Sequence, residues 1–182
     1  MNVIKCALPD LLILEPKVFS DERGFFYESY NARAMAEIAG ITAGFVQDNY
    51  SHSVRNVLRG MHYQVGQAAQ GKLIRATTGE IFDVAVDIRR SSPTCGKWIA
   101  SVLSGENNRM LWVPPGFAHG FLVTSAHAEV QYKTTTFWAP QHERCILWND
   151  PELGITWPLD GEPIVSAKDR AGVSLKEAEL LP

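Results

Sequence analysis

Two histidines in apolar, strand-like segments are the first residues of this sequence that could carry chemistry. His62 lies in LRGMHYQ (58–64), and His119 follows a Pro-Pro-Gly turn in VPPGFAHGF (113–121). An imidazole changes its charge near neutral pH, so each can act as a base, an acid or a metal ligand. A single barrel histidine can equally be structural. Two histidines at matched barrel positions would project into one cavity, which favours a functional role.

A metal site is the first possibility to weigh. The spacing Pro-x-Gly-x-x-His at 114–119 resembles the second half of the motif of cupins. In metal-binding cupins the first half supplies two histidines and a glutamate, because a divalent metal needs three or four converging ligands. Here that half reads GMHYQ, with Gln64 in place of the second histidine. His62 and His119 alone make a poor metal site, so we expect none.

A histidine that acts as a base needs a group that orients it. Asp169 in SAKDRAG is a candidate for His62, because a carboxylate bonded to one imidazole nitrogen fixes the tautomer and stabilises the imidazolium. Ser166 and Asp169 also have the spacing of a capping box at a helix start. A purely structural role for Asp169 therefore remains open.

Three other polar residues are ambiguous in the same way. Tyr132 lies in the strand-like VQYKTT and could be a proton donor, although strand tyrosines are more often core or interface residues. Lys72 opens a strand after the loop GQAAQG; it would stabilise an oxyanion in a dry cavity but is otherwise solvated. Arg59, directly before Gly60, has equally open roles.

The elements that must position these residues are mostly strands. KLIRATTGEIFDVAVDIRR (72–90) alternates apolar and polar residues on both sides of a Thr-Gly turn, which predicts a half-buried hairpin. KWIASVLSGENNRMLWVPPGFAHGFLV (97–123) repeats the pattern, and AEVQYKTTTFW (128–138) predicts a further strand. We therefore expect a mainly β fold, a cupin-like jelly-roll barrel or sandwich, over a single domain spanning 1–182.

Two short helices are expected beside the strands. ARAMAEIA (32–39) has Asn31 as an N-cap and Gly40 as its C-terminal stop. LKEAELL (175–181) follows Ser174, which with Glu177 has capping-box spacing.

Composition excludes several classes of protein. The 182 residues carry a net charge of −3, which gives no global reason to bind nucleic acid or an acidic membrane surface. An anionic ligand must be held by local basic residues. The three cysteines are few, odd in number and far apart, and no signal peptide or membrane span is visible. We expect a cytoplasmic protein with reduced thiols.

The sequence as a whole resembles the dTDP-4-dehydrorhamnose 3,5-epimerase family. The resemblance runs nearly end to end, and the order and spacing of its segments make it specific. The segments are DERGFFYESYN (21–31), FVQDNYSHS (45–53), VLRGMHYQ (57–64), QGKLIRATTGEIFDVAVDIRRSSPT (70–94), WVPPGFAHGF (112–121), YKTTTFWAP (132–140), WNDPELGITWP (148–158) and SAKD (166–169).

The resemblance implies a role for each candidate. His62 falls on the family's general base and Asp169 on its paired carboxylate. Tyr132 falls on the proton donor and Lys72 on the lysine beside the substrate's keto oxygen. Trp138 stands where the family often has a tyrosine that stacks on thymine; its π-face would keep the stacking but not a hydroxyl contact. The remaining substrate-binding positions are Arg23, Glu28, Gln47, Asn49, Arg59, His119, Glu143 and Lys168.

The implied substrate is dTDP-4-keto-6-deoxy-D-glucose, epimerised at the third and fifth ring carbons to dTDP-4-keto-L-rhamnose in dTDP-L-rhamnose biosynthesis. The ketone acidifies both neighbouring C–H groups, a base forms the enolate, and an acid returns a proton to the opposite face. This chemistry needs no redox cofactor, and a lysine at the enolate oxygen can replace a metal. The family also forms homodimers, in which Arg23 and Glu28 would serve the neighbouring chain.

Three rival functions remain open at this point. The nearest is an epimerase of the same fold that inverts one centre of another deoxysugar. A second is a non-catalytic sugar-nucleotide-binding cupin, although a binder has no use for an acid and a base on opposite faces. The third, a metal-dependent cupin dioxygenase, requires the metal site that Gln64 argues against.

Overall fold

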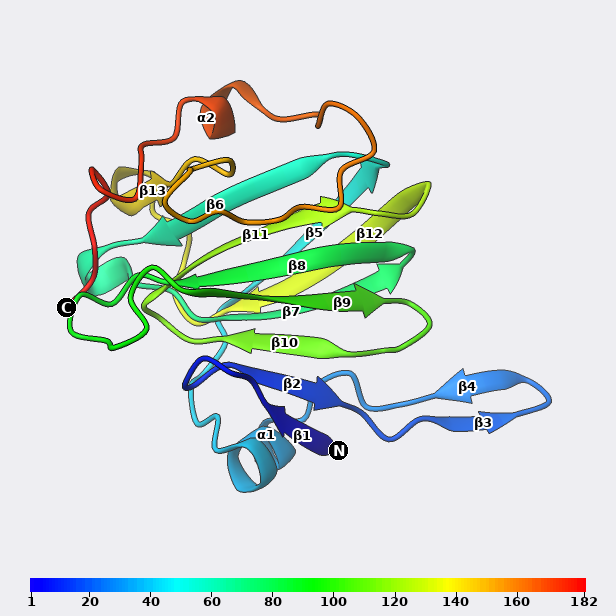
Figure 1. Cartoon of the computed structure of the whole chain (residues 1–182). Coiled ribbons are helices and arrows are strands. Elements are labelled where there is room, and N and C mark those ends of the chain that lie inside the picture. The colour runs from blue at the N-terminus through cyan, green and yellow to red at the C-terminus, as the bar shows by residue number, and fades with distance from the viewer.

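Two antiparallel β-sheets face each other in the structure, a computed structural model that describes residues 1–182 (Figure 1). The six-stranded sheet has the order β1 (Asn2–Lys5), β2 (Leu12–Glu15), β10 (Met110–Val113), β7 (Lys72–Thr78), β12 (His127–Thr134) and β5 (Gln47–Val54). The five-stranded sheet has the order β13 (Glu143–Cys145), β6 (Leu58–Gln64), β11 (Phe117–Val123), β8 (Glu80–Asp87) and β9 (Trp98–Ser104). The expected mainly β jelly-roll fold is confirmed.

The predicted hairpins are wrong, although their strands exist. β7 pairs with β10 and β12, whereas β8 pairs with β9 and β11, so the chain changes sheets at Gly79. β9 and β10 are likewise divided between the two sheets. Alternation reports only that each strand has one buried face. Two strands on facing sheets satisfy that condition as well as two strands of one hairpin.

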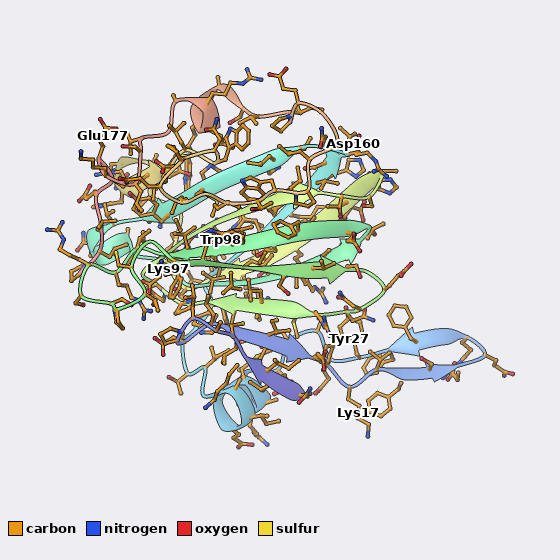
Figure 2. The ribbon with its side chains drawn as sticks, viewed as in Figure 1. Lys17, Tyr27, Lys97, Trp98, Asp160 and Glu177 are labelled. Atoms are coloured by element: carbon orange, nitrogen blue, oxygen red, sulfur yellow. The ribbon has the colours of Figure 1, made fainter.

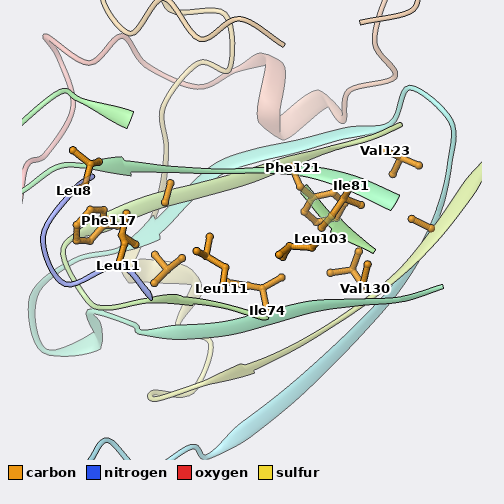
Figure 3. Close-up of a cluster of buried hydrophobic side chains, with 14 residues drawn as sticks. Leu8, Leu11, Ile74, Ile81, Leu103, Leu111, Phe117, Phe121, Val123 and Val130 are labelled. Atoms are coloured by element: carbon orange, nitrogen blue, oxygen red, sulfur yellow. The ribbon is translucent and has the colours of Figure 1, made fainter. Parts of the chain in front are cut away.

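The main core lies between the sheets, as Figure 3 shows. Most of its side chains come from the inward positions of both sheets, so that each sheet buries the apolar face of the other, and Leu8 and Leu11 come from the segment between β1 and β2. The cluster consists of Leu8, Leu11, Ile74, Ala76, Ile81, Ala85, Leu103, Leu111, Val113, Phe117, Phe121, Val123, Ala128 and Val130.

Each sheet also has a covered outer face. The segment after β13 packs on the five-stranded sheet and buries Ile146, Leu153 and Trp157 there. The helix α1 (Ala32–Ala39) packs Met35 against the six-stranded sheet. As expected, Asn31 Oδ1 accepts a hydrogen bond from the α1 backbone, and Gly40 ends the helix with a φ of 70°.

The second expected helix is wrong. Residues 175–177 form a turn, although the backbone N–H of Ser174 does donate to Glu177 Oε2 over 3.4 Å, which is one of the two bonds of a capping box. The backbone N–H of Leu175 instead donates to Asp150, and Leu181 pairs with Arg89. These tertiary contacts hold the segment in a non-helical conformation beyond the turn. The other short helices are η1 (Gly66–Ala68), η2 (Pro140–His142) and α2 (Ala167–Arg170). None of the helices has the length and apolar composition that a membrane-spanning helix needs.

A third, two-stranded sheet stands away from the sandwich. The hairpin of β3 (Phe19–Asp21) and β4 (Gly24–Phe26) projects from the body of the molecule (Figure 1). Lys17 and Tyr27 mark its base in Figure 2. Phe19, Phe25 and Phe26 are exposed along it by 53%, 62% and 67%. Apolar surface of this kind marks an interaction site.

β6 and β11 approach each other closely where they carry the two histidines. Their register shifts between His119 and Phe121, and Gly60 has a φ of 123°. A Cβ on Gly60 would lie 2.6 Å from the Cα of Gly120 and 2.8 Å from the carbonyl oxygen of His119. Only glycine combines this conformation with this spacing.

We therefore expect Gly60→Ala to destabilise the protein by about 3 kcal/mol or more, from backbone strain and overpacking together. The midpoint temperature of thermal unfolding should then fall by roughly 6–12 °C. Gly24→Ala is the matched control, because Gly24 has a φ of 124° and nothing within 4 Å of the added Cβ. Equal losses in the two variants would show that the contact with β11 contributes nothing.

Candidate active site

A cavity of about 420 Å³ lies between the sheets and contains nine of the thirteen predicted site residues. Strands of both sheets contribute to its wall, together with the segment between β12 and β13. The lining residues are Gln47, Asn49, Tyr50, Ser51, Arg59, His62, Tyr63, Gln64, Gln70, Lys72, His119, Gly120, Phe121, Tyr132, Trp138 and Glu143.

His62 is held by a buried carboxylate. Its Nε2 lies 2.6 Å from Asp169 Oδ1, and the backbone N–H of Gly60 donates to the other oxygen over 3.2 Å. Burial alone would raise the pKa of Asp169, but the hydrogen bond and charge of His62 outweigh it and lower that pKa. Asp169 is therefore ionised and accepts the Nε2 proton. The Nδ1 lone pair of neutral His62 is left free to take a proton.

The capping interpretation of Asp169 is also correct. Ser166 Oγ accepts a hydrogen bond of 3.1 Å from the backbone N–H of Asp169 at the start of α2. The cap uses the backbone of Asp169, whereas His62 uses its side chain. The two roles that the sequence left open therefore coexist, and the cap fixes the position from which the carboxylate reaches β6.

His119 has a carboxylate partner that sequence reasoning missed. Both oxygens of Asp83 lie 2.9 Å from His119 Nε2, and both side chains are buried. Burial raises the pKa of Asp83, and the charge and hydrogen bond of His119 offset part of that rise. The available signal was a charged residue on the inward face of an apolar strand, two positions from both Ile81 and Ala85. His62 is thus not the only barrel histidine with such a partner.

The geometry at the histidines fits hydrogen bonding better than a shared metal. His62 and His119 face each other on neighbouring strands, but each binds its own carboxylate. His62, Cys145 and Asp169 bring three possible ligand atoms within 4.8 Å. The 2.6 Å separation of His62 and Asp169 is shorter than two ligands of one zinc ion allow, about 3.3 Å. Burial also raises the pKa of the Cys145 thiol to about 12.

Lys72 is a buried cation in the cavity wall. It opens β7, where its backbone pairs with Val113 of β10 and Thr134 of β12. Burial lowers its pKa to about 8, and the nearby charges of Glu143 and Asp83 prevent a larger fall. At neutral pH Lys72 is mostly protonated and can stabilise negative charge that develops on a bound oxygen.

Tyr132 lies on the wall opposite His62. β12 belongs to the six-stranded sheet and β6 to the five-stranded sheet, and both residues line the cavity. Burial raises the pKa of Tyr132, an effect that Arg59 opposes and Glu143 reinforces. The phenol is therefore protonated at neutral pH and can donate to a ligand between the sheets.

The cavity mouth carries an aromatic side chain and fixed charges. The indole of Trp138, 58% exposed, donates through Nε1–H to Glu143 Oε2 over 3.1 Å. Glu143 also forms an ion pair with Lys168, which lies outside the cavity wall. Burial would raise the pKa of Glu143, but the hydrogen bonds from Lys168 and Trp138 outweigh it and lower that pKa. Glu143 is therefore a carboxylate.

Polar groups of β5 and β6 complete the lining. Arg59 donates through Nε and Nη2 to Ser53 Oγ, each over 3.1 Å. Gln47 Nε2 donates to Asn49 Oδ1 over 2.9 Å. Arg59 is the guanidinium of the wall and can receive an anionic group.

Arg23 and Glu28 lie outside this cavity. Arg23 pairs with Asp21 in the projecting hairpin, and its side chain is 85% exposed. Glu28 accepts a hydrogen bond from Asn31 at the start of α1. The chain's own cavity therefore receives neither residue.

Comparisons with known proteins identify the family of this chain. The family model described as dTDP-4-dehydrorhamnose 3,5-epimerase matches residues 5–177. The enzyme of that name from Pseudomonas aeruginosa is 59% identical over 182 residues, covering 100% of both chains. The Escherichia coli enzyme of that name is 53% identical, covering 97% of this chain and 96% of that one.

Solved structures give the same result. The dTDP-6-deoxy-D-glucose-3,5-epimerase of Legionella pneumophila, in complex with dTDP-4-keto-L-rhamnose, has a TM-score of 0.95 at 51% identity and covers 98% of this chain and 94% of its own. ChmJ, a 3'-monoepimerase from Streptomyces bikiniensis, has a TM-score of 0.89 at 31% identity and covers 94% of this chain and 86% of its own. From the match of the family model and the near-complete relatives, the chain belongs to the dTDP-4-dehydrorhamnose 3,5-epimerase family.

Proposed function

We propose that this protein epimerises dTDP-4-keto-6-deoxy-D-glucose at the third and fifth ring carbons, giving dTDP-4-keto-L-rhamnose for dTDP-L-rhamnose biosynthesis, and that the cavity between the sheets is where it does so. The observation that carries the assignment of the site is the oriented His62–Asp169 pair on one wall and the protonated Tyr132 on the other. An acid and a base on opposite sides of one cavity are what inversion at carbon requires.

The first step is proton removal by His62. Its Nε2–H is committed to Asp169, so Nδ1 receives the proton from a ring carbon beside the ketone. The C–H electron pair forms a carbon–carbon double bond while the carbonyl π pair moves to oxygen, which gives the enolate. Asp169 stabilises the imidazolium that results, as a buried carboxylate does in other paired bases.

The enolate oxygen needs a positive partner, and Lys72 supplies it. The ammonium is buried in the cavity wall, where its attraction for an oxyanion is little screened by water. Tyr132 then delivers its phenolic proton to the face of the ring opposite His62. Water then takes the proton from His62 and returns one to the Tyr132 phenolate, which restores the base and the acid. The same sequence at the second carbon completes the reaction, with no net change of oxidation state.

The rest of the substrate is held toward the cavity mouth. Trp138 presents an exposed indole face for the thymine base, and Arg59 offers a guanidinium to the diphosphate. Gln47, Asn49, His119 and Glu143 provide hydrogen-bonding groups around the sugar, and Lys168 adds positive charge next to Glu143.

The functional form is a homodimer in this proposal. The hairpin of β3 and β4 exposes Phe19, Phe25 and Phe26, which a second copy would cover. Arg23 on that hairpin and Glu28 beyond it would then contribute to the partner's cavity rather than to their own. The free cysteines suit the reducing cytoplasm, where we expect the enzyme to act.

Inversion of one centre is the competing activity, since ChmJ, a 3'-monoepimerase, has the same fold. Incubation with the keto sugar in heavy water separates the two. Deuterium at both the third and fifth carbons, with product that a reductase specific for the L-configured sugar consumes, supports the double epimerase. Deuterium at a single carbon contradicts it.

We expect His62→Asn to fold normally and to lose deuterium exchange at both ring carbons. A positioned base contributes about 10²–10⁴-fold, and no other group in the cavity has its geometry relative to Asp169. Proton NMR of the substrate in heavy water measures exchange at each carbon separately. Exchange near the parent rate in a folded variant would assign the base to another residue, His119 with Asp83 being the first to test.

We expect Tyr132→Phe to separate exchange from inversion. The ring and its packing remain, but the donated proton is lost. His62 can still remove a proton and return deuterium to the face from which it came, so label should enter without formation of the L-configured sugar. The measurement compares deuterium incorporation with product by NMR. Inversion at both centres near the parent rate would make the tyrosine structural.

Activity should fall as the pH rises above about 8, because Lys72 loses its charge through its lowered pKa. The neutral amine no longer stabilises the enolate. This fall should appear as the alkaline limb of the pH profile of kcat/KM, which reports the free enzyme. In the profile of kcat the limb should lie at higher pH, because the bound anionic substrate favours the protonated lysine. Lys72→Met should be slow and lack this limb. If the alkaline limb persists at the same pH in that variant, a group other than Lys72 causes the loss of activity.

A further inference from the structure

Gln64 occupies a buried position two residues after the proposed base. Its side-chain amide forms hydrogen bonds with the backbone of two loops. Nε2 donates to the carbonyl oxygen of Ala68 over 2.8 Å and to that of Phe137 over 3.2 Å. Oε1 accepts the backbone N–H of Ala139 over 2.7 Å. The amide therefore holds the backbone on both sides of Trp138.

Packing does little to fix that stretch of chain. Phe137 and Trp138 are 67% and 58% exposed, so packing contributes little to their position. Trp138 bonds through its backbone N–H to Gln47 Oε1 over 3.0 Å and through its indole to Glu143. Hydrogen bonds to the cavity wall, rather than burial, set the orientation of the indole.

The chemistry of the amide explains why a glutamine serves here. Two N–H donors and a carbonyl acceptor lie on one planar group, and all three take part. A glutamate would lose both donors. A histidine, which would complete a cupin metal pair with His62, could not serve two acceptors and one donor at once.

We infer that Gln64 is a positioning residue for nucleotide recognition: it holds Trp138 in the orientation that receives the base of a nucleoside diphosphate. This inference rests on the proposed function, in which Trp138 stacks on thymine. If the loop is already fixed before binding, no conformational entropy of the loop is lost when the ligand binds, and the affinity is higher. One strand, β6, then carries both the proposed base and the support of the base-stacking residue.

The test is a double-mutant cycle on dTDP binding, measured by calorimetry without the sugar. Gln64→Met keeps the side-chain length and removes all three hydrogen bonds. We expect it to weaken dTDP binding by about 3- to 10-fold, the range expected for ordering one aromatic side chain. Trp138→Ala should weaken it by roughly 5- to 150-fold through lost stacking. In the Trp138→Ala background, Gln64→Met should change the affinity less than about 2-fold, because its effect passes through the indole.

Separate effects on KM and kcat distinguish this positioning role from a purely structural one. Gln64→Met should raise KM for the keto sugar nucleotide and leave kcat within about 2-fold, since His62, Lys72 and Tyr132 stay in place. Gln64→Glu keeps the acceptor for Ala139 and removes the donors to Ala68 and Phe137, and it serves as the second variant if the first does not fold. It should also weaken dTDP binding.

Three results would overturn the inference. Independent, additive effects of the two substitutions on dTDP affinity would show that Gln64 does not act through Trp138. A lowered melting temperature with unchanged dTDP affinity would make Gln64 purely structural, and unchanged affinity in Trp138→Ala would remove the residue through which it acts. These binding results are independent of turnover, so they are distinguishable from failure of the proposed epimerisation.

Discussion

The hydrogen bond between His62 and Asp169 is the contact on which the proposed chemistry depends. It joins β6 to α2, two elements that are separated in the sequence by more than a hundred residues and by the strands β7 to β13. Asp169 reaches His62 only because the segment after β13 packs on the outer face of the five-stranded sheet. The apolar contacts of Trp157 and Val165 therefore bear on the proposed catalysis, since loosening that segment would release the carboxylate that orients the proposed base.

The two facing sheets impose the second constraint. One sheet supplies His62 and His119, and the other supplies Lys72 and Tyr132. Inversion needs an acid and a base on opposite faces of a sugar ring, and strands of a single sheet would present both from one side. The buried core that holds the sheets together thereby also holds the proposed acid and base apart.

Buried charges in the cavity balance one another. Lys72 is attracted to Glu143 and Asp83, Asp83 is bonded to His119, and Glu143 is paired with Lys168. An unpaired charge in this position would shift its pKa and become neutral. Here the cation is retained with a pKa of about 8, which leaves it charged at neutral pH yet less strongly hydrated than a surface lysine.

Local patterns determined much of this protein from the sequence alone: the β class, the strands β6 to β12 and α1, whose signals depend on neighbouring residues. The resemblance to the epimerase family also singled out the nine predicted residues that line the cavity. Strand pairing was beyond such patterns, because alternation is identical for a hairpin and for β7 and β8 in facing sheets. The partnership of Asp83 with His119, and the amide of Gln64 around Trp138, likewise needed the tertiary structure. Which polar groups meet in a buried cavity depends on contacts between segments far apart in the chain, and only the packing of the two sheets decides those contacts.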